Sequence, residues 1–138
     1  MAGAEPVRIV LADDEKLLRT AMAALLPQDG TIVVVAQAED GDGAVRETLE
    51  HRPDVLVVDL EMPGANGLDA VARIREHHPE QAVLMLTRHA RPGVLRRALK
   101  LGVQGFMSKS ADPEDIVAVV HELRAGRRWI AHEVLEHP

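Results

Sequence analysis

Five polar side chains stand at the ends of apolar runs, and together they have the chemistry to bind a metal ion and a phosphoryl group: Asp13, Asp14, Asp59, Thr87 and Lys109. Carboxylates about 5 Å apart repel each other by roughly 3 kcal/mol per pair at an effective dielectric constant near 20. Mg²⁺ removes this repulsion, takes oxygen ligands and keeps positions for water and a phosphate oxygen. Lysine and threonine then bind phosphoryl oxygens, and an aspartate beside the metal is a candidate phosphoryl acceptor.

These side chains can act together only if the fold brings them to one place, and the apolar pattern predicts such a fold. Five β-rich apolar runs, each of the kind that forms a buried parallel strand, occupy residues 7–12, 32–36, 55–58, 82–86 and 105–107. Segments with helical spacing of apolar residues alternate with them. This alternation predicts βαβ units and a parallel sheet with helices on both faces. Because ligands bind outside the carboxyl ends of such strands, the five polar residues are expected at one edge.

The helices are expected around residues 17–25, 44–49, 68–75, 95–101 and 113–123. The last of them is the best marked, with Asp112 as N-cap, Pro113 at the first helical position and Gly126 as the stop. The segment 127–138 has little periodicity and is interpreted as a tail or the start of a linker. The sequence therefore predicts one domain over residues 6–126.

Composition excludes several other classes of protein. The chain of 138 residues has no Cys, so disulfide scaffolds and thiolate chemistry are excluded. Its net charge of −6 and its aromatic content of 1% disfavour direct nucleic-acid binding by this chain. No apolar run approaches the roughly 20 residues that span a bilayer, and the first residues do not form a signal peptide. A cytoplasmic protein without a membrane partner is expected.

The sequence resembles the receiver domains of two-component response regulators over about residues 6–126. The matching stretches are residues 9–15 (IVLADDE), 57–64 (VVDLEMPG), 86–87 (LT) and 105–109 (GFMSK). Each stretch is weak evidence alone, but their order on the ends of successive strands is specific. The resemblance implies a flavodoxin-like, doubly wound α/β fold with five parallel strands in the order 2-1-3-4-5 and five helices.

The resemblance also implies an acceptor and a metal site. Asp59 would accept a phosphoryl group from the phosphohistidine of a sensor histidine kinase. Asp14 and Asp59 would bind Mg²⁺ directly, Asp13 would act through water, and the backbone carbonyl of Glu61 would complete the protein ligands. The protein would be no enzyme beyond its own phosphorylation and slow autodephosphorylation.

Three further residues carry implied roles in a conformational switch. Lys109 would bind the phosphoryl oxygens, and Thr87 would move towards them. Phe106 takes the position of the aromatic residue that turns inward as the domain switches. Only the phosphorylated state gains these contacts, so phosphorylation would shift the population of conformations.

The stretch 125–130 (AGRRWI) resembles the end of the receiver in NarL/FixJ-type (LuxR-type) transcription factors, where a linker and a helix-turn-helix domain follow. The expected output is therefore transcription, controlled through a DNA-binding domain that this sequence lacks. A truncated chain is favoured over a stand-alone receiver, although both stay open. A weak or phosphorylation-dependent homodimer is also expected, with the basic residues Arg96, Arg97 and Lys100 facing acidic residues of the last helix.

Two other classes of function compete with a phosphorylated receiver. A dehalogenase-like phosphohydrolase needs Asp-x-Asp after the first strand, whereas here the candidate nucleophile follows the third strand and its second carboxylate is Glu61. The second alternative is a degenerate receiver that is not phosphorylated and acts as a constitutive binding module. One observation favours it: Arg88 follows Thr87, where the family usually has a small residue. The guanidinium would either narrow access to the pocket or contact the phosphoryl group. Glu61 and His89 are expected to tune dephosphorylation, in a direction that the sequence does not determine.

Overall fold

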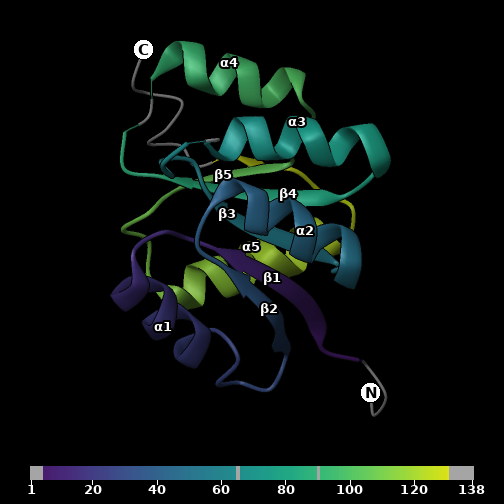
Figure 1. Ribbon diagram of the computed structural model, residues 1–138. Coiled ribbons are helices and arrows are strands. Elements are labelled where there is room, and N and C mark those ends of the chain that lie inside the picture. The colour runs from purple at the N-terminus through teal and green to yellow at the C-terminus, as the bar shows by residue number, and fades with distance from the viewer. Residues whose placement is uncertain (1–4, 65, 90, 131–138) are drawn as a thin grey trace.

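The structure is a computed structural model that describes residues 5–64, 66–89 and 91–130. Strands and helices alternate along the chain as the apolar pattern predicts (Figure 1). The elements are β1 (Val7–Ala12), α1 (Lys16–Leu25), β2 (Ile32–Ala38), α2 (Gly41–His51), β3 (Val55–Asp59), α3 (Gly67–His77), β4 (Ala82–Thr87), α4 (Pro92–Lys100), β5 (Gly105–Ser108), α5 (Pro113–Arg124) and β6 (Trp129–Ile130).

The strands form one parallel sheet in the order β2-β1-β3-β4-β5-β6, which confirms the expected order 2-1-3-4-5. The expectation of five strands needs a correction, because β6 lies in the segment interpreted as a tail. Its two residues pair with Gly105 and Phe106 of β5, and Trp129 donates its backbone N–H to the carbonyl of Gln104 at 2.8 Å. The unpaired backbone groups along the edge of β5 explain why so short a segment becomes a strand.

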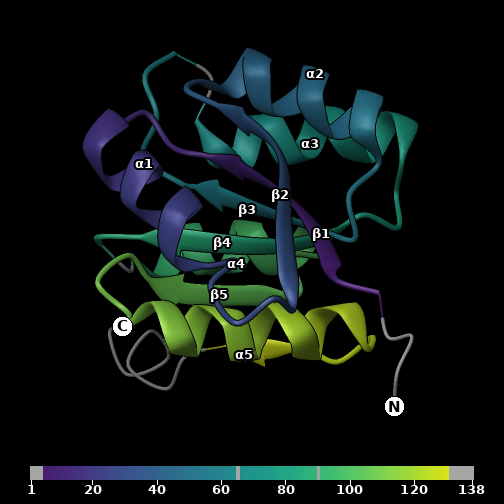
Figure 2. The same ribbon diagram turned by 90° about the horizontal axis from the view of Figure 1, so that it is seen from below.

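Helices cover both faces of the sheet, with α2, α3 and α4 on one side and α1 and α5 on the other (Figures 1 and 2). Alternate residues of each strand point to opposite layers. In β3, for example, Leu56 and Val58 pack in the layer of α2, α3 and α4, whereas Val55 and Val57 pack in the layer of α1 and α5. All five residues of β3 are buried, so the strand that ends in Asp59 is held by cores on both faces.

A close approach of backbones fixes the loop after β3. A Cβ atom at Gly67, the first residue of α3, would lie 2.6 Å from the carbonyl oxygen of Asp59 and 2.9 Å from the Cα of Leu60. The N–H of Gly67 also donates to the carbonyl of Leu60 at 2.9 Å. Only glycine fits here, because any side chain would push α3 away from the end of β3. Asn66 and Asp69 add a capping box that fixes the start of the helix.

On the opposite edge of the sheet, Arg75 ties three segments together. Its guanidinium donates to the carbonyls of Leu101 at 2.8 Å, Gln81 at 2.5 Å and Gly102 at 3.1 Å. Burial lowers the pKa of Arg75 from its ordinary value. The end of α3 is thereby joined to the start of β4 and to the turn between α4 and β5, which places the strands that end in Thr87 and Ser108.

At the start of α5, Asp112 holds the N-cap position as expected, but its side chain makes no capping hydrogen bond. The fixed backbone of Pro113 at the first helical position and the acidic residues Glu114 and Asp115 in the first turn favour the helix start instead.

Candidate functional site

Four of the sequence-predicted residues meet at the carboxyl edge of the sheet. Asp13 directly follows β1, Asp59 ends β3, Thr87 ends β4 and Lys109 directly follows β5. All four are buried. The strand order changes direction between β1 and β3, so the site lies at the topological switch point, where open α/β sheets bind their ligands.

Three carboxylates gather at this edge. One oxygen each from Asp13, Asp14 and Asp59 can be chosen so that all lie within 4.8 Å of one another. Asp13 and Asp59 are buried, whereas Asp14 is exposed, so the group is open to solvent on one side. This set of hard oxygen donors fits Mg²⁺, which prefers carboxylates and keeps several waters.

Lys109 supplies the positive charge inside the site. Its ammonium group lies 2.8 Å from Asp59 Oδ2 and 3.2 Å from Asp13 Oδ1, and it also donates to Glu15. Burial lowers the pKa of Lys109, but the bonds to Asp59 and Glu15 outweigh burial and raise the pKa above its ordinary value. The lysine therefore stays an ammonium group that is aimed at Asp59.

Asp59 is the most strongly perturbed carboxyl group of the site. Burial, with a smaller contribution from the charge of Asp13, raises its pKa from 3.8 to about 7 against the lowering effect of Lys109. The other oxygen, Oδ1, accepts the backbone N–H of Glu61 at 3.0 Å. A nearby cation would favour the charged, nucleophilic form of this carboxylate.

Thr87 lies at the predicted place, but its hydroxyl is engaged by a neighbour. It donates to the carboxylate of Glu61 and accepts the backbone N–H of His89 at 3.1 Å. The other oxygen of Glu61 accepts the backbone N–H of Arg88 at 3.0 Å. Glu61 therefore takes part in the site through its side chain as well as its backbone. Phe106 is completely buried in the layer of α2, α3 and α4, so in this structure the ring already lies inside.

Sequence reasoning missed the role of Glu15. Both of its carboxylate oxygens accept hydrogen bonds from the guanidinium of Arg88, at 2.5 and 2.6 Å, and one of them also accepts from Lys109. The hydrogen bonds with Arg88 and Lys109 hold the pKa of Glu15 at about 2. A signal was present in the sequence, because an acidic residue after β1 and a basic residue after β4 belong to the same edge.

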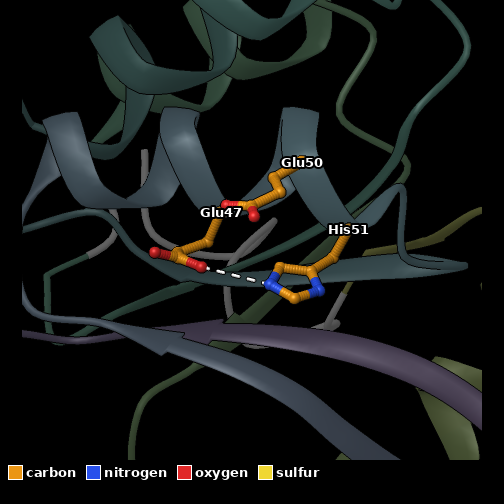
Figure 3. Close-up of side chains that lie close together, drawn as sticks. All are labelled: Glu47, Glu50 and His51. Carbon is orange, nitrogen blue, oxygen red and sulfur yellow. Dashed lines mark ion pairs between the residues drawn. The ribbon is translucent and has the colours of Figure 1, made fainter.

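A second group of potential ligands, which the sequence analysis did not single out, lies near the end of α2. Glu47, Glu50 and His51 can also place ligand atoms within 4.8 Å of one another. The His51 ring faces Glu47 (Figure 3), with Nε2 3.3 Å from Oε1 one helical turn away. A pair of residues four positions apart, with the histidine near the negative end of the helix dipole, explains why these three side chains lie together without need of a metal ion.

The fold and the site define a doubly wound α/β protein with an acidic, lysine-containing site at its switch point. The profile of the response regulator receiver domain matches residues 9–121, and the chain belongs to this family. Within the described ranges, no helix has both the length and the apolar character needed to cross a membrane.

Related sequences are response regulators and transcriptional regulators. The chain is 38% identical over 125 residues to the oxygen regulatory protein NreC of Staphylococcus epidermidis. The aligned region covers 90% of this chain and 57% of NreC. It is 34% identical over 127 residues to the probable transcriptional regulatory protein NarL of Mycobacterium tuberculosis. The aligned region covers 92% of this chain and 59% of that protein. The chain thus spans a little over half the length of these relatives.

Solved structures agree with this assignment. A LuxR-family two-component response regulator from Aurantimonas sp. SI85-9A1 superimposes with a TM-score of 0.90 at 31% identity, covering 96% of this chain and 95% of that one. The receiver domain of the putative NarL from M. tuberculosis gives a TM-score of 0.84 at 34% identity, covering 89% and 99% of the two chains. The resemblance to receivers of the NarL/LuxR type is confirmed.

Proposed function

We propose that this receiver accepts a phosphoryl group on Asp59 from a sensor histidine kinase and thereby switches an output, transcription through a DNA-binding domain. The observation that carries the proposal is the position of Asp59, buried at the switch point with Oδ2 2.8 Å from the ammonium group of Lys109. Family membership supports the kinase as donor. Relatives that are named as transcriptional regulatory proteins support transcription as the output.

The transfer is a displacement at phosphorus. A carboxylate oxygen of Asp59 forms a bond to phosphorus while the bond between phosphorus and the donor's imidazole nitrogen breaks, and that nitrogen keeps the electron pair. The donor ring carries a proton on its other nitrogen, so the products are an aspartyl phosphate and a neutral histidine. Later, water attacks phosphorus, the bond to the Asp59 oxygen breaks, and inorganic phosphate leaves while the carboxylate is restored.

Mg²⁺ held directly by Asp14, Asp59 and the backbone carbonyl of Glu61, and by Asp13 through water, would neutralise charge on the transferring group. The chain's own residues do the remaining work. Lys109 is already aimed at Asp59, so it can bind a phosphoryl oxygen without large movement.

The switch follows from competition for Thr87. Before phosphorylation its hydroxyl donates to Glu61. A phosphoryl oxygen on Asp59 offers a second acceptor, and moving the hydroxyl to it would free Glu61 and reposition the segment after β4. Because only the phosphorylated state has this acceptor, phosphorylation favours the moved position. Phe106 is buried at the outset, so we assign the first movement to Thr87 and the segment after β4.

We also propose a homodimer that is weak or depends on phosphorylation. Arg96 and Lys100 on α4 are exposed and available to a partner. Glu122 on α5, in contrast, pairs with Arg127 of its own chain at 2.9 Å. Sedimentation with and without beryllium fluoride, a phosphoryl mimic, tests the dimer, and a single unchanged monomer under both conditions would refute it.

The acceptor role is tested by intact-protein mass after incubation with Mg²⁺ and a small phosphoryl donor. We expect one phosphoryl adduct on the wild type and none on Asp59→Asn or in the presence of a chelator. Asp54→Asn, which removes a carboxylate at the opposite edge of the sheet, should be labelled like the wild type. Equal labelling of wild type and Asp59→Asn would refute the proposal.

A further inference from the structure

Asp59 is part of a closed circuit of hydrogen bonds that also includes Lys109, Glu15, Arg88 and Glu61. On one side Asp59 accepts from Lys109, Lys109 also donates to Glu15, and Glu15 accepts from the guanidinium of Arg88. On the other side Asp59 accepts the N–H of Glu61, and the Glu61 carboxylate accepts the backbone N–H of Arg88 at 3.0 Å. Arg88 therefore closes the circuit, holding Glu15 with its side chain and Glu61 with its backbone.

Exposure increases outward along this circuit. The side chain of Asp59 is 0% exposed and that of Lys109 is 2% exposed, whereas Glu15 is 39% and Arg88 52% exposed. A phosphoryl donor has to approach an Asp59 oxygen in line with its leaving group, and a completely covered carboxylate does not allow this approach. The Glu15–Arg88 pair is the part that opens most easily, because water competes for both of its charges.

We propose that the Glu15–Arg88 ion pair is a gate over Asp59 that controls how fast the phosphoryl group enters and leaves. The inference rests on the proposed role of Asp59 as the acceptor. While the gate is closed, Glu15 accepts a hydrogen bond from the ammonium group of Lys109 and links the β1–α1 loop to the segment after β4. Opening frees the ammonium group for phosphoryl oxygens and uncovers Asp59. Closing over the aspartyl phosphate excludes the water that would otherwise attack phosphorus and release inorganic phosphate.

Two variants open the gate in different ways. Arg88→Ala removes the cation, and Glu15→Gln keeps the size of the side chain but removes its charge. Glu15 makes no side-chain cap to α1, so helix α1 should not suffer. Arg127→Ala is the matched control, since it breaks the pair that Arg127 forms with Glu122 of α5, whose side chains have similar exposure, 65% and 43%.

We expect both gate variants to form the adduct faster with acetyl phosphate and Mg²⁺, and to lose it faster after the donor is removed. The expected increase is about fivefold in each rate, which corresponds to about 1 kcal/mol in the barrier. The control should keep wild-type rates. Slower or unchanged labelling of Arg88→Ala would overturn the gate, because slower labelling would mean that the guanidinium binds the phosphoryl group.

Hydrogen exchange of the Glu61 amide, measured without metal or donor, gives a second readout. This amide donates to Asp59, so it should exchange faster in both gate variants, and unchanged exchange would overturn the gate. If no variant acquires an adduct, the acceptor role of Asp59 fails instead. Exchange of the Glu61 amide then still decides whether the ion pair covers this carboxylate.

Discussion

Burial of Asp59 makes stability depend on pH, and Asp59→Asn should remove this dependence. The folded protein holds the proton of Asp59 up to about pH 7, whereas the ordinary pKa of the group is 3.8. The folded state thus binds the proton more tightly than the unfolded state. The resulting stabilisation is complete below pH 3.8 and is lost as the pH rises through 7. At about 1.4 kcal/mol per pH unit, the loss amounts to about 4 kcal/mol.

The assay is urea unfolding at pH 5, 6, 7 and 8 with a chelator present, so that no divalent ion binds the carboxylates. The free energy of unfolding of the wild type should fall over this range, and that of Asp59→Asn should fall much less. The hydrogen bonds with Arg88 and Lys109 lower the pKa of Glu15 from 4.5 to about 2. The stability that Glu15 contributes to the fold is therefore present above pH 4.5 and is lost only as the pH falls towards 2. Glu15 does not contribute to a change in stability between pH 5 and 8. Asp42→Asn, at an exposed carboxylate, is the control. Parallel curves for wild type and Asp59→Asn would show that burial of Asp59 does not set the pH dependence of stability.

Three further changes test the anchoring of α3, the loop after β3 and the metal site. Arg75→Met should lower the free energy of unfolding by about 3 kcal/mol in urea titrations, because three backbone carbonyls lose their donor, and a loss below about 1 kcal/mol would contradict this role. Gly67→Ala should lower the free energy of unfolding by about 1–3 kcal/mol, because its Cβ would lie 2.6 Å from the backbone of Asp59. The control Gly93→Ala, where no atom lies within 4 Å of the added Cβ, should leave the free energy of unfolding unchanged or raise it. Equal effects of the two variants would argue against the close approach at Gly67. Mg²⁺ at a hundredfold its Kd should stabilise the wild type by about 2.7 kcal/mol in thermal melts, and an equal effect of K⁺ at matched ionic strength would show that no specific site exists.

The features set by local sequence were predictable. An apolar run that ends in a polar residue marks a buried strand and its carboxyl end, so the polar residues at the carboxyl ends of β1, β3, β4 and β5 were located correctly. Helix α4 begins at Pro92, earlier than its apolar residues indicated. The proline in its first turn favours a helix start, but no side chain of this turn is buried. Hydrophobic spacing therefore gives no signal there.

The features set by distant partners were not predictable. The strand β6 forms only because β5 offers a free edge, and the sequence Trp129-Ile130 alone is too short to indicate a strand. Likewise, the hydrogen bond between Thr87 and Glu61 and the ion pair of Glu15 with Arg88 depend on the distance between loops. Spacing along the chain indicates which edge a residue belongs to, but not which neighbour its side chain meets.

Chemical mapping identifies the residue that carries the phosphoryl group, which is the role proposed for Asp59. Borohydride reduces an aspartyl phosphate to homoserine, so protein treated with Mg²⁺ and acetyl phosphate is reduced, digested and sequenced by mass spectrometry. Homoserine is expected at position 59, and its formation should depend on both Mg²⁺ and the donor. Homoserine at position 13 or 14 instead, or at no position in protein that carries the adduct, would contradict this role of Asp59.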